Sequence, residues 1–182
     1  MKRHALGVFL ASLALFVWGA VFWMSPLPYG LFGKTADDGA AGQALLRHFP
    51  DSATYVLPGM YNPPDRLEAL TKAGPIATVH IRRAGSDTMS PATLGLGFMH
   101  ELAVVTLLAI LLHRVRESLP VYRSRVKFVT AAGVASAAFG NLAMPIWWQH
   151  PWPFYLINSV YEVVAWFLVG LVLARFIRPV VP

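Results

Sequence analysis

The chain has 182 residues, of which 56% are hydrophobic and only 13% are charged, and it contains no cysteine. Soluble domains carry charge on about a quarter of their residues, so this composition excludes a disordered chain, a disulfide scaffold and a thiol enzyme, and it indicates a membrane protein. The formal net charge of +6 is gathered in a few short segments, which is typical of membrane topology. We therefore expect no nucleic-acid partner.

Four apolar stretches are each long enough to cross a hydrocarbon core of about 30 Å at a helical rise of about 1.5 Å per residue. They cover residues 5–24, 92–113, 128–148 and 154–174. We therefore predict an all-α integral membrane protein, with four transmembrane helices that form a bundle and with the lipid bilayer as a partner.

The first stretch follows a positively charged start, so it could also be a cleaved signal peptide. However, its apolar run continues from Ala5 to Met24, whereas the apolar part of a signal peptide is about 7–15 residues long and is followed by a small-residue cleavage site. The bulky residues Val21, Phe22 and Trp23 do not form such a site. We therefore expect residues 1–24 to be a short cytoplasmic N-terminus and an uncleaved transmembrane anchor.

The first part of the segment 25–91 contains turn signals, and the rest alternates between helix and strand signals. Thr35, with Asp38 three residues later, resembles a cap that opens a helix, and Ser90 with Pro91 begins the second transmembrane helix. The predicted elements between them are a helix to about His48, a strand over 54–57, a helix over 65–73 and a strand over 75–82. We therefore predict a small extracytoplasmic α/β cap, packed on the bundle, between the first two transmembrane helices.

The positions of the cations predict the orientation of the chain. Lys and Arg favour the cytoplasmic side of short loops, whereas the segment 25–91 has no net charge because its six cations balance six acidic residues. We therefore expect a bacterial inner (plasma) membrane protein with both termini in the cytoplasm, a basic cytoplasmic loop within residues 92–182, and 25–91 outside. The side predicted to be cytoplasmic holds nine cations, opposed only by Glu117: Lys2, Arg3, Arg114, Arg116, Arg123, Arg125, Lys127, Arg175 and Arg178.

The connection between the last two helices, residues 145–153, is rich in proline and tryptophan. Proline interrupts helical hydrogen bonding, so we expect the third helix to kink or end near Met144. Trp147, Trp148 and Trp152 fall at the outer ends of the spans, where tryptophan anchors helices at the interface; a docking surface for a partner or a lipid is the alternative. This connection and the overall layout resemble those of small bacterial inner-membrane proteins, a likeness that implies no activity.

The sequence contains no motif that predicts a reaction. A Gly-rich phosphate loop, G-x-S-x-G and H-E-x-x-H are absent. His100 and Glu101 are followed by Val104 at the position where a zinc-protease helix needs its second histidine. Without cysteine, thiolate metal sites and disulfide redox chemistry are excluded. We therefore predict no catalytic residue, no cofactor and no metal site, and we do not expect an enzyme.

What remains is a set of polar side chains within the predicted spans, where ionisable groups are costly and face the protein interior or a pathway. Counted from the outer ends of their helices, Glu162 lies about nine residues deep and Glu101 about ten. The two carboxyls therefore have similar depth. The candidate intramembrane polar site comprises His100, Glu101, Asn141, Asn158 and Glu162.

Three interpretations of this site stay open from the sequence alone. Its side chains could join the helices by hydrogen bonds, which are often worth about 1 kcal/mol and fix the helix register. The carboxyls and His100 could instead bind a metal ion, with Met99 or Met144 as an added soft ligand, or relay protons. Finally, His100 could serve an intramembrane active site or hold an organic cofactor such as haem.

Small residues repeat every four positions on the third helix, a pattern that allows helices to approach closely in lipid. Together with the tryptophans they form a candidate interface, which could pack the bundle internally or bind a second copy or another membrane protein. We therefore predict a non-catalytic accessory, assembly or interaction protein. The alternative is a small transporter, or a protein that handles metal ions or protons through Glu101, Glu162 and His100; a membrane enzyme ranks third. The candidate interface comprises Gly133, Ala137, Gly140, Trp147, Trp148 and Trp152.

Overall fold

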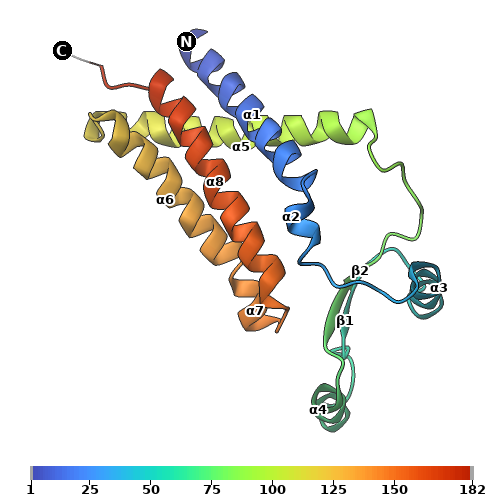
Figure 1. The fold of residues 1–182 in the computed structure, drawn as a ribbon. Helices are drawn as coiled ribbons and strands as arrows, with labels where there is room; N and C mark the ends of the chain where they lie inside the picture. Colours follow the sequence, from blue (N-terminus) through green and yellow to red (C-terminus); the bar gives the residue numbers. More distant parts are fainter. Residues whose placement is uncertain (1, 181–182) are drawn as a thin grey trace. The chain divides into compact units, whose positions relative to one another are not determined.

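The computed structural model describes residues 2–180, which form two compact units. Among these residues, the helical unit comprises 2–32, 89–145 and 151–180, and the small unit comprises Gly33–Thr88 and Ile146–His150. The elements (Figure 1) are, in chain order, α1 (Lys2–Trp23), α2 (Pro26–Tyr29), α3 (Asp38–His48), β1 (Thr54–Leu57), α4 (Pro64–Ala73), β2 (Ala77–His80), α5 (Pro91–Val115), the 3-10 helix η1 (Arg116–Ser118), α6 (Tyr122–Gly140), α7 (Ala143–Trp147) and α8 (Trp152–Phe176).

Four helical segments are long and apolar enough to cross a membrane, as the sequence predicts. The segment that contains α5 begins where expected, because the Ser90 hydroxyl accepts a hydrogen bond of 3.0 Å from the Thr93 amide. Pro91 occupies the first helical position. An N–H at that position has no acceptor within the helix, so proline loses no hydrogen bond there. The four segments are Lys2–Trp23, Pro91–Ser118, Tyr122–Trp147 and Trp152–Phe176.

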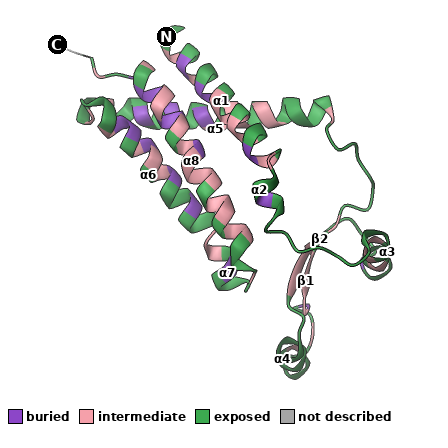
Figure 2. Ribbon diagram, in the orientation of Figure 1, coloured by how far each residue is buried: buried purple, intermediate pink, exposed green. Residues whose placement is uncertain are grey.

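Helix α8 is the central element of the helical unit, since it packs against both α6 and α1, while α5 packs on α1. Figure 1 shows α1, α8 and α6 side by side, with α5 crossing them. The core lies where the second half of α5 meets the other three helices, and includes Val105, Leu112, Val129, Val169 and Leu173. The first half of α5 is largely exposed (Figure 2). The predicted four-helix bundle is therefore not confirmed.

Two close approaches to α8 depend on glycine. A Cβ atom at Gly133 on α6 would lie 2.5 Å from the Cβ atom of Trp166 on α8. One at Gly7 on α1 would lie 2.5 Å from the Cβ atom of Phe176, at the end of α8. Both distances are far shorter than a van der Waals contact, so a larger residue at either position would push the backbones apart. Glycine thus brings α1 and α6 close to the same helix, as small residues commonly do in membranes.

The third span breaks earlier than the sequence predicts. Helix α6 ends at Gly140, and α7 follows after two residues, whereas proline was expected to end the helix near Met144. The amides of those two residues both donate to the Ala137 carbonyl, at 2.9 and 3.1 Å, which widens the turn and ends the α-helical pattern. Pro145 lies in the first turn of α7, where proline is tolerated, so the proline does not cause the break.

The small unit contains the predicted two-stranded sheet. Strands β1 and β2 are antiparallel, and Thr54 pairs with His80, whose Nδ1 lies 2.9 Å from the threonine Oγ1. The predicted cap of α3 was wrong by two residues: Asp37, not Thr35, accepts a first-turn amide, at 2.9 Å. The physical reason is position, because only the residue directly before the helix can reach that amide with its side chain.

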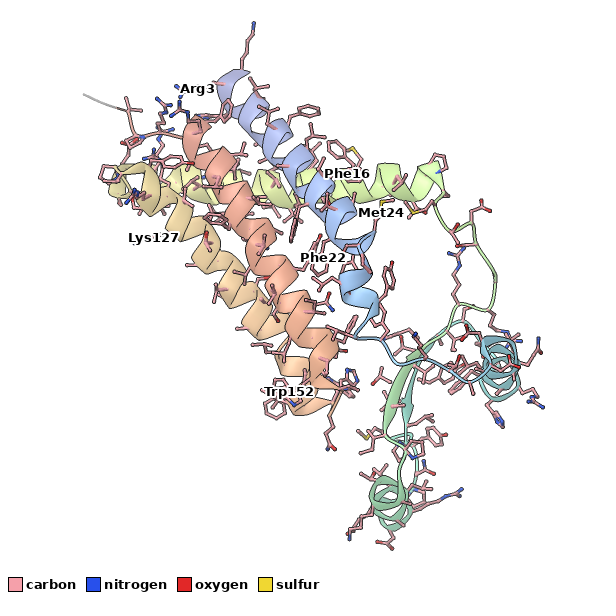
Figure 3. The ribbon with its side chains drawn as sticks, in the orientation of Figure 1. Arg3, Phe16, Phe22, Met24, Lys127 and Trp152 are labelled. Atoms are coloured by element: carbon pink, nitrogen blue, oxygen red, sulfur yellow. The ribbon has the colours of Figure 1, made fainter. Side chains whose placement is uncertain are left out.

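Cations gather at one end of the helical unit, where α1 begins and α8 ends (Figure 3, labels Arg3 and Lys127). Arg125 is only 4% exposed and donates to two carbonyls of the α5–α6 connection, at 2.9 and 2.8 Å, and to the Ala174 carbonyl at 3.3 Å. Arg3 donates to the Arg175 carbonyl at 3.1 Å. These bonds satisfy carbonyls at the end of α8, which lack helical partners and attract cations.

We expect Gly133→Ala to lower the free energy of unfolding by about 1–3 kcal/mol, because the added methyl overlaps Trp166 and forces α6 away from α8. Gly97→Ala on α5 is the matched control, since a Cβ atom there would meet no heavy atom within 4 Å and alanine favours a helix over glycine by about 1 kcal/mol. Reversible unfolding in mixed detergent micelles measures both variants. A Gly133→Ala protein as stable as the original would contradict this packing.

Candidate functional site

A hydrogen bond between two spans lies at the centre of the candidate site. Asn141 follows α6 directly and donates from Nδ2 to Oε2 of Glu162 on α8, at 2.8 Å. Both residues are half-buried. Because the helix breaks after Gly140, this asparagine lies at the widened turn, and its side chain joins the third span to the fourth. This contact is of the helix-joining kind that the sequence left open.

Glu101 on α5 reaches a polar group of α8 beside a glycine of α1. A Cβ atom at Gly19 would lie 3.2 Å from the Tyr161 hydroxyl and 3.9 Å from Oε1 of Glu101, so both polar groups border the space that the glycine leaves open. Glu101 and Glu162 both interact electrostatically with Tyr161. The second carboxyl oxygen of Glu101, Oε2, is buried and has no hydrogen-bond partner among the described residues.

Aromatic side chains of α1 surround Tyr161. Its ring centroid lies 4.9 Å from that of Phe22 (labelled in Figure 3), 5.5 Å from that of Trp23 and 6.1 Å from that of Trp18, whose ring is nearly parallel to it. The indole Nε1 of Trp18 donates to the Tyr161 carbonyl at 3.1 Å. These contacts fix the rotation of α8 relative to α1, and therefore the direction in which Tyr161 and Glu162 point.

Two predicted members of the site form no hydrogen bond with its other residues among residues 2–180. Asn158 shares a helix face with Glu162, but it donates from Nδ2 to the Phe154 carbonyl of its own helix, at 3.0 Å. His100 is exposed and makes no hydrogen bond or ring contact within residues 2–180. Neighbouring helical residues differ in direction by about 100°, so turning Glu101 inward turns His100 outward.

Sequence reasoning missed three contributors to the site. Tyr161 is next to Glu162 but was not included in the predicted site, and Gly19 and Trp18 were not considered. Gly19 is one of several small residues in the first apolar stretch, and such residues are a usual sign of a close neighbour in a membrane. Arg125, expected only as a cytoplasmic cation, was missed as a buried donor because nothing in the sequence shows which arginine faces a helix end.

The chemistry open to the site follows from these contacts. The free oxygen of Glu101 can accept a hydrogen bond, and the carboxyl can donate one when it carries a proton. No group of three or more His, Asp or Glu side chains within residues 2–180 is arranged to hold a metal ion. The contacts that the structure shows at this site are the hydrogen bond from Asn141 to Glu162 and the ring contacts of Tyr161.

The candidate interface divides into covered and exposed residues. Gly133 packs against Trp166, and Ala137 is only 2% exposed. A partner cannot reach these two residues while the chain is folded, so Gly133 and Ala137 serve internal packing. The other members of the candidate interface are exposed: Gly140, Trp147, Trp148 and Trp152.

A different face, on α5, has no cover from the described residues. Leu96, His100, Ala103 and Leu107 follow one another at spacings of four, three and four residues, which places them on one side of the helix. All four are exposed, and Leu96 and Leu107 are 72% and 63% exposed. We call these four residues the α5 seam. It is an apolar face with one histidine near its middle.

Comparison with known proteins gives no further guide to this arrangement. No protein-family model matches the chain, and no curated protein and no solved structure is significantly similar to it.

We expect Glu162→Gln to leave the stability nearly unchanged, because glutamine keeps an acceptor oxygen for Asn141. Glu162→Leu removes that acceptor and should cost about 1 kcal/mol. A double-mutant cycle with Asn141→Leu, followed by unfolding in mixed micelles, should give a coupling energy of about 0.6–1.7 kcal/mol. If Asn141→Leu has the same effect whether residue 162 is glutamate or leucine, the two side chains do not interact.

Proposed function

We propose that the protein is a non-catalytic accessory protein of a membrane, and that it docks the α5 seam onto a transmembrane helix of another protein. One observation carries the proposal: His100 is exposed on an apolar face of a helix long enough to cross a membrane. An imidazole that faces hydrocarbon is costly, and such groups normally face a partner or a water-filled cavity. The described residues offer His100 neither hydrogen bond nor ring contact.

The spacing of the seam favours a helix as the occupant. Alternating steps of four and three residues are the pattern by which one helix packs along another. Ala103, between the two larger apolar residues, allows a close approach of backbones. A single polar residue in an otherwise apolar seam selects one register over others, which is a role that His100 would have against a partner with a matching polar group.

The chemistry favours a different protein over a second copy as that partner. The chain's own groups at similar depth are turned inward, since Asn141 donates to Glu162 and Glu101 borders Gly19. Pairing α5 with a second α5 would therefore offer His100 another imidazole or apolar side chains. A carboxyl, amide or hydroxyl on a different transmembrane helix is the complement that an imidazole needs.

A photo-cross-linking amino acid at Leu107 should join the protein to one discrete polypeptide in its native membrane. His100→Leu should weaken the association with that polypeptide about five- to thirtyfold, as expected for the loss of one interhelical hydrogen bond. His100→Asn, which keeps a polar group, should restore part of the yield. Val134, half exposed on α6, is the control position and should capture lipid. A product of twice the chain mass would replace the partner protein by a second copy, and capture of lipid alone from Leu107 would refute docking.

We also propose that the membrane is a bacterial inner membrane and that both termini are cytoplasmic, with residues 25–91 outside. The support is the gathering of cations at one end of the helical unit, where Arg3 and Arg125 bond to the end of α8. Short basic segments are retained on the cytoplasmic side.

A periplasm-active reporter enzyme inserted after Gly85 should therefore be active, and the same reporter after Ser118 should be inactive. Reversed activities would show that the basic end faces outward. Immunoblotting of both fusions checks that each is produced in comparable amounts.

A second candidate function is proton handling, and the unpartnered Oε2 of Glu101 beside the Tyr161 hydroxyl favours it. Buried carboxyls within a membrane commonly belong to proton pathways. Proton movement into vesicles separates the two candidates. A proton pathway predicts that Glu101→Gln and Glu162→Gln abolish this movement without loss of stability. An accessory role predicts that the original protein moves no protons.

A further inference from the structure

A groove lies at the basic end of the helical unit. The residues of the polar site do not line it, but it adjoins the α5 seam, since Ile110 follows Leu107 by three residues on one side of the helix. The groove runs between the first turns of α1 and the last turns of α5, and Ile177 closes it beyond the end of α8. Its volume is about 460 Å³, which is within the usual range of about 300–1,000 Å³ for small-molecule sites.

The wall of this groove is mostly apolar, with cationic and imidazole groups at one end. Thr106 also lines it, but its hydroxyl donates to the Leu102 carbonyl of its own helix at 2.7 Å. The apolar part of the wall comes from Ala5 and Val8 on α1, Ala109 and Ile110 on α5, and Ile177. Apolar side chains can make van der Waals contacts with a hydrocarbon chain, but they cannot hold a free ion by charge or hydrogen bonds. The length of the apolar wall therefore favours a ligand with a hydrocarbon part.

The polar end carries cationic and hydrogen-bonding groups. His4 and His113 line it together with Arg114, and the two imidazole centroids are 5.3 Å apart. Nδ1 of His113 also lies 2.6 Å from Nη1 of Arg116. The groove thus combines a guanidinium group with two imidazoles at the first turn of α1, where the helix dipole favours an anion.

No Asp or Glu among the described residues lines the groove. Glu117 is the nearest acidic residue along the chain, and its carboxylate already has donors. Its Oε1 accepts a hydrogen bond from Nε of Arg116 at 2.8 Å and another from the Val180 amide at 3.2 Å. Its charge is therefore balanced locally. The charge at this end remains positive and complements an anion.

We propose that the groove binds an anionic phospholipid, with the phosphate at Arg114, His4 and His113 and an acyl chain along the apolar wall. Basic pockets between helices at the cytoplasmic face of a membrane bind anionic headgroups in this manner. Ile110 and Arg114 continue the spacing of the α5 seam, so the groove and the seam share one side of α5. Lipid binding in the groove would hold the first turns of α1 against the end of α5.

Native mass spectrometry of the full chain in detergent, titrated with phosphatidylglycerol or phosphatidylcholine of equal acyl length, tests the proposal. We expect retention of one anionic lipid and no comparable retention of the zwitterionic one. Arg114→Gln should weaken binding about fivefold, the usual contribution of one cation near a lipid headgroup. Arg123→Gln is the matched control, since it removes the same charge from the same end of the helical unit but does not line the groove.

A second variant tests the apolar wall. Ala5 is exposed at the mouth of the groove, so Ala5→Trp should fill it and block lipid without disturbing the core. Equal losses from Arg114→Gln and Arg123→Gln would show only general attraction to the basic end and would overturn the proposal. Three other results would also overturn the proposal. They are equal binding of both lipids, unchanged lipid binding after Ala5→Trp, and binding of soluble glycerol phosphate as tight as that of the anionic lipid.

Discussion

The close approach of α1 and α6 to α8 is the constraint on which the rest of the helical unit depends. In lipid the hydrophobic effect does not press helices together, so their association relies on van der Waals packing and on a few polar contacts. Gly7 and Gly133 allow that packing on two sides of one helix. The polar contacts follow from it, because Trp18 and Asn141 reach α8 only when its neighbours are this close.

Several polar groups within the described spans bond to nearby partners, and two groups of α5 differ from them. At the basic end, arginines donate to carbonyls that the end of α8 leaves open, and within the spans an asparagine amide meets a carboxylate. The two groups of α5 are Oε2 of Glu101, which is buried without a partner, and the imidazole of His100, which is exposed. They lie on neighbouring residues of α5, and the two candidate functions differ in which of them matters.

Helix α5 differs from the other spans in how it is covered. Its second half contributes to the core, whereas its first half is largely exposed. An uncovered apolar helix is unremarkable in a membrane, where lipid covers it. A histidine within that face changes the expectation, since lipid cannot hydrogen-bond to it. The lipid groove begins where the seam ends, since Ile110 lies three residues after Leu107, so the two proposed sites are neighbours on one side of this helix.

The sequence by itself determined the four spans, the small sheet and the separation of basic from neutral segments, because apolar length, β-branched alternation and charge are local properties of the chain. It also identified Glu101, Asn141 and Glu162 as polar residues whose exposure to lipid would cost free energy. Only the tertiary structure decided which of them meet. Neighbours such as His100 and Glu101 differ in direction by about 100°, so the rotation of α5 decides which of the two side chains is buried and which is exposed. Glycine contacts and the ring contacts of Tyr161 set the rotations and distances of the helices, and these contacts join residues far apart in the chain.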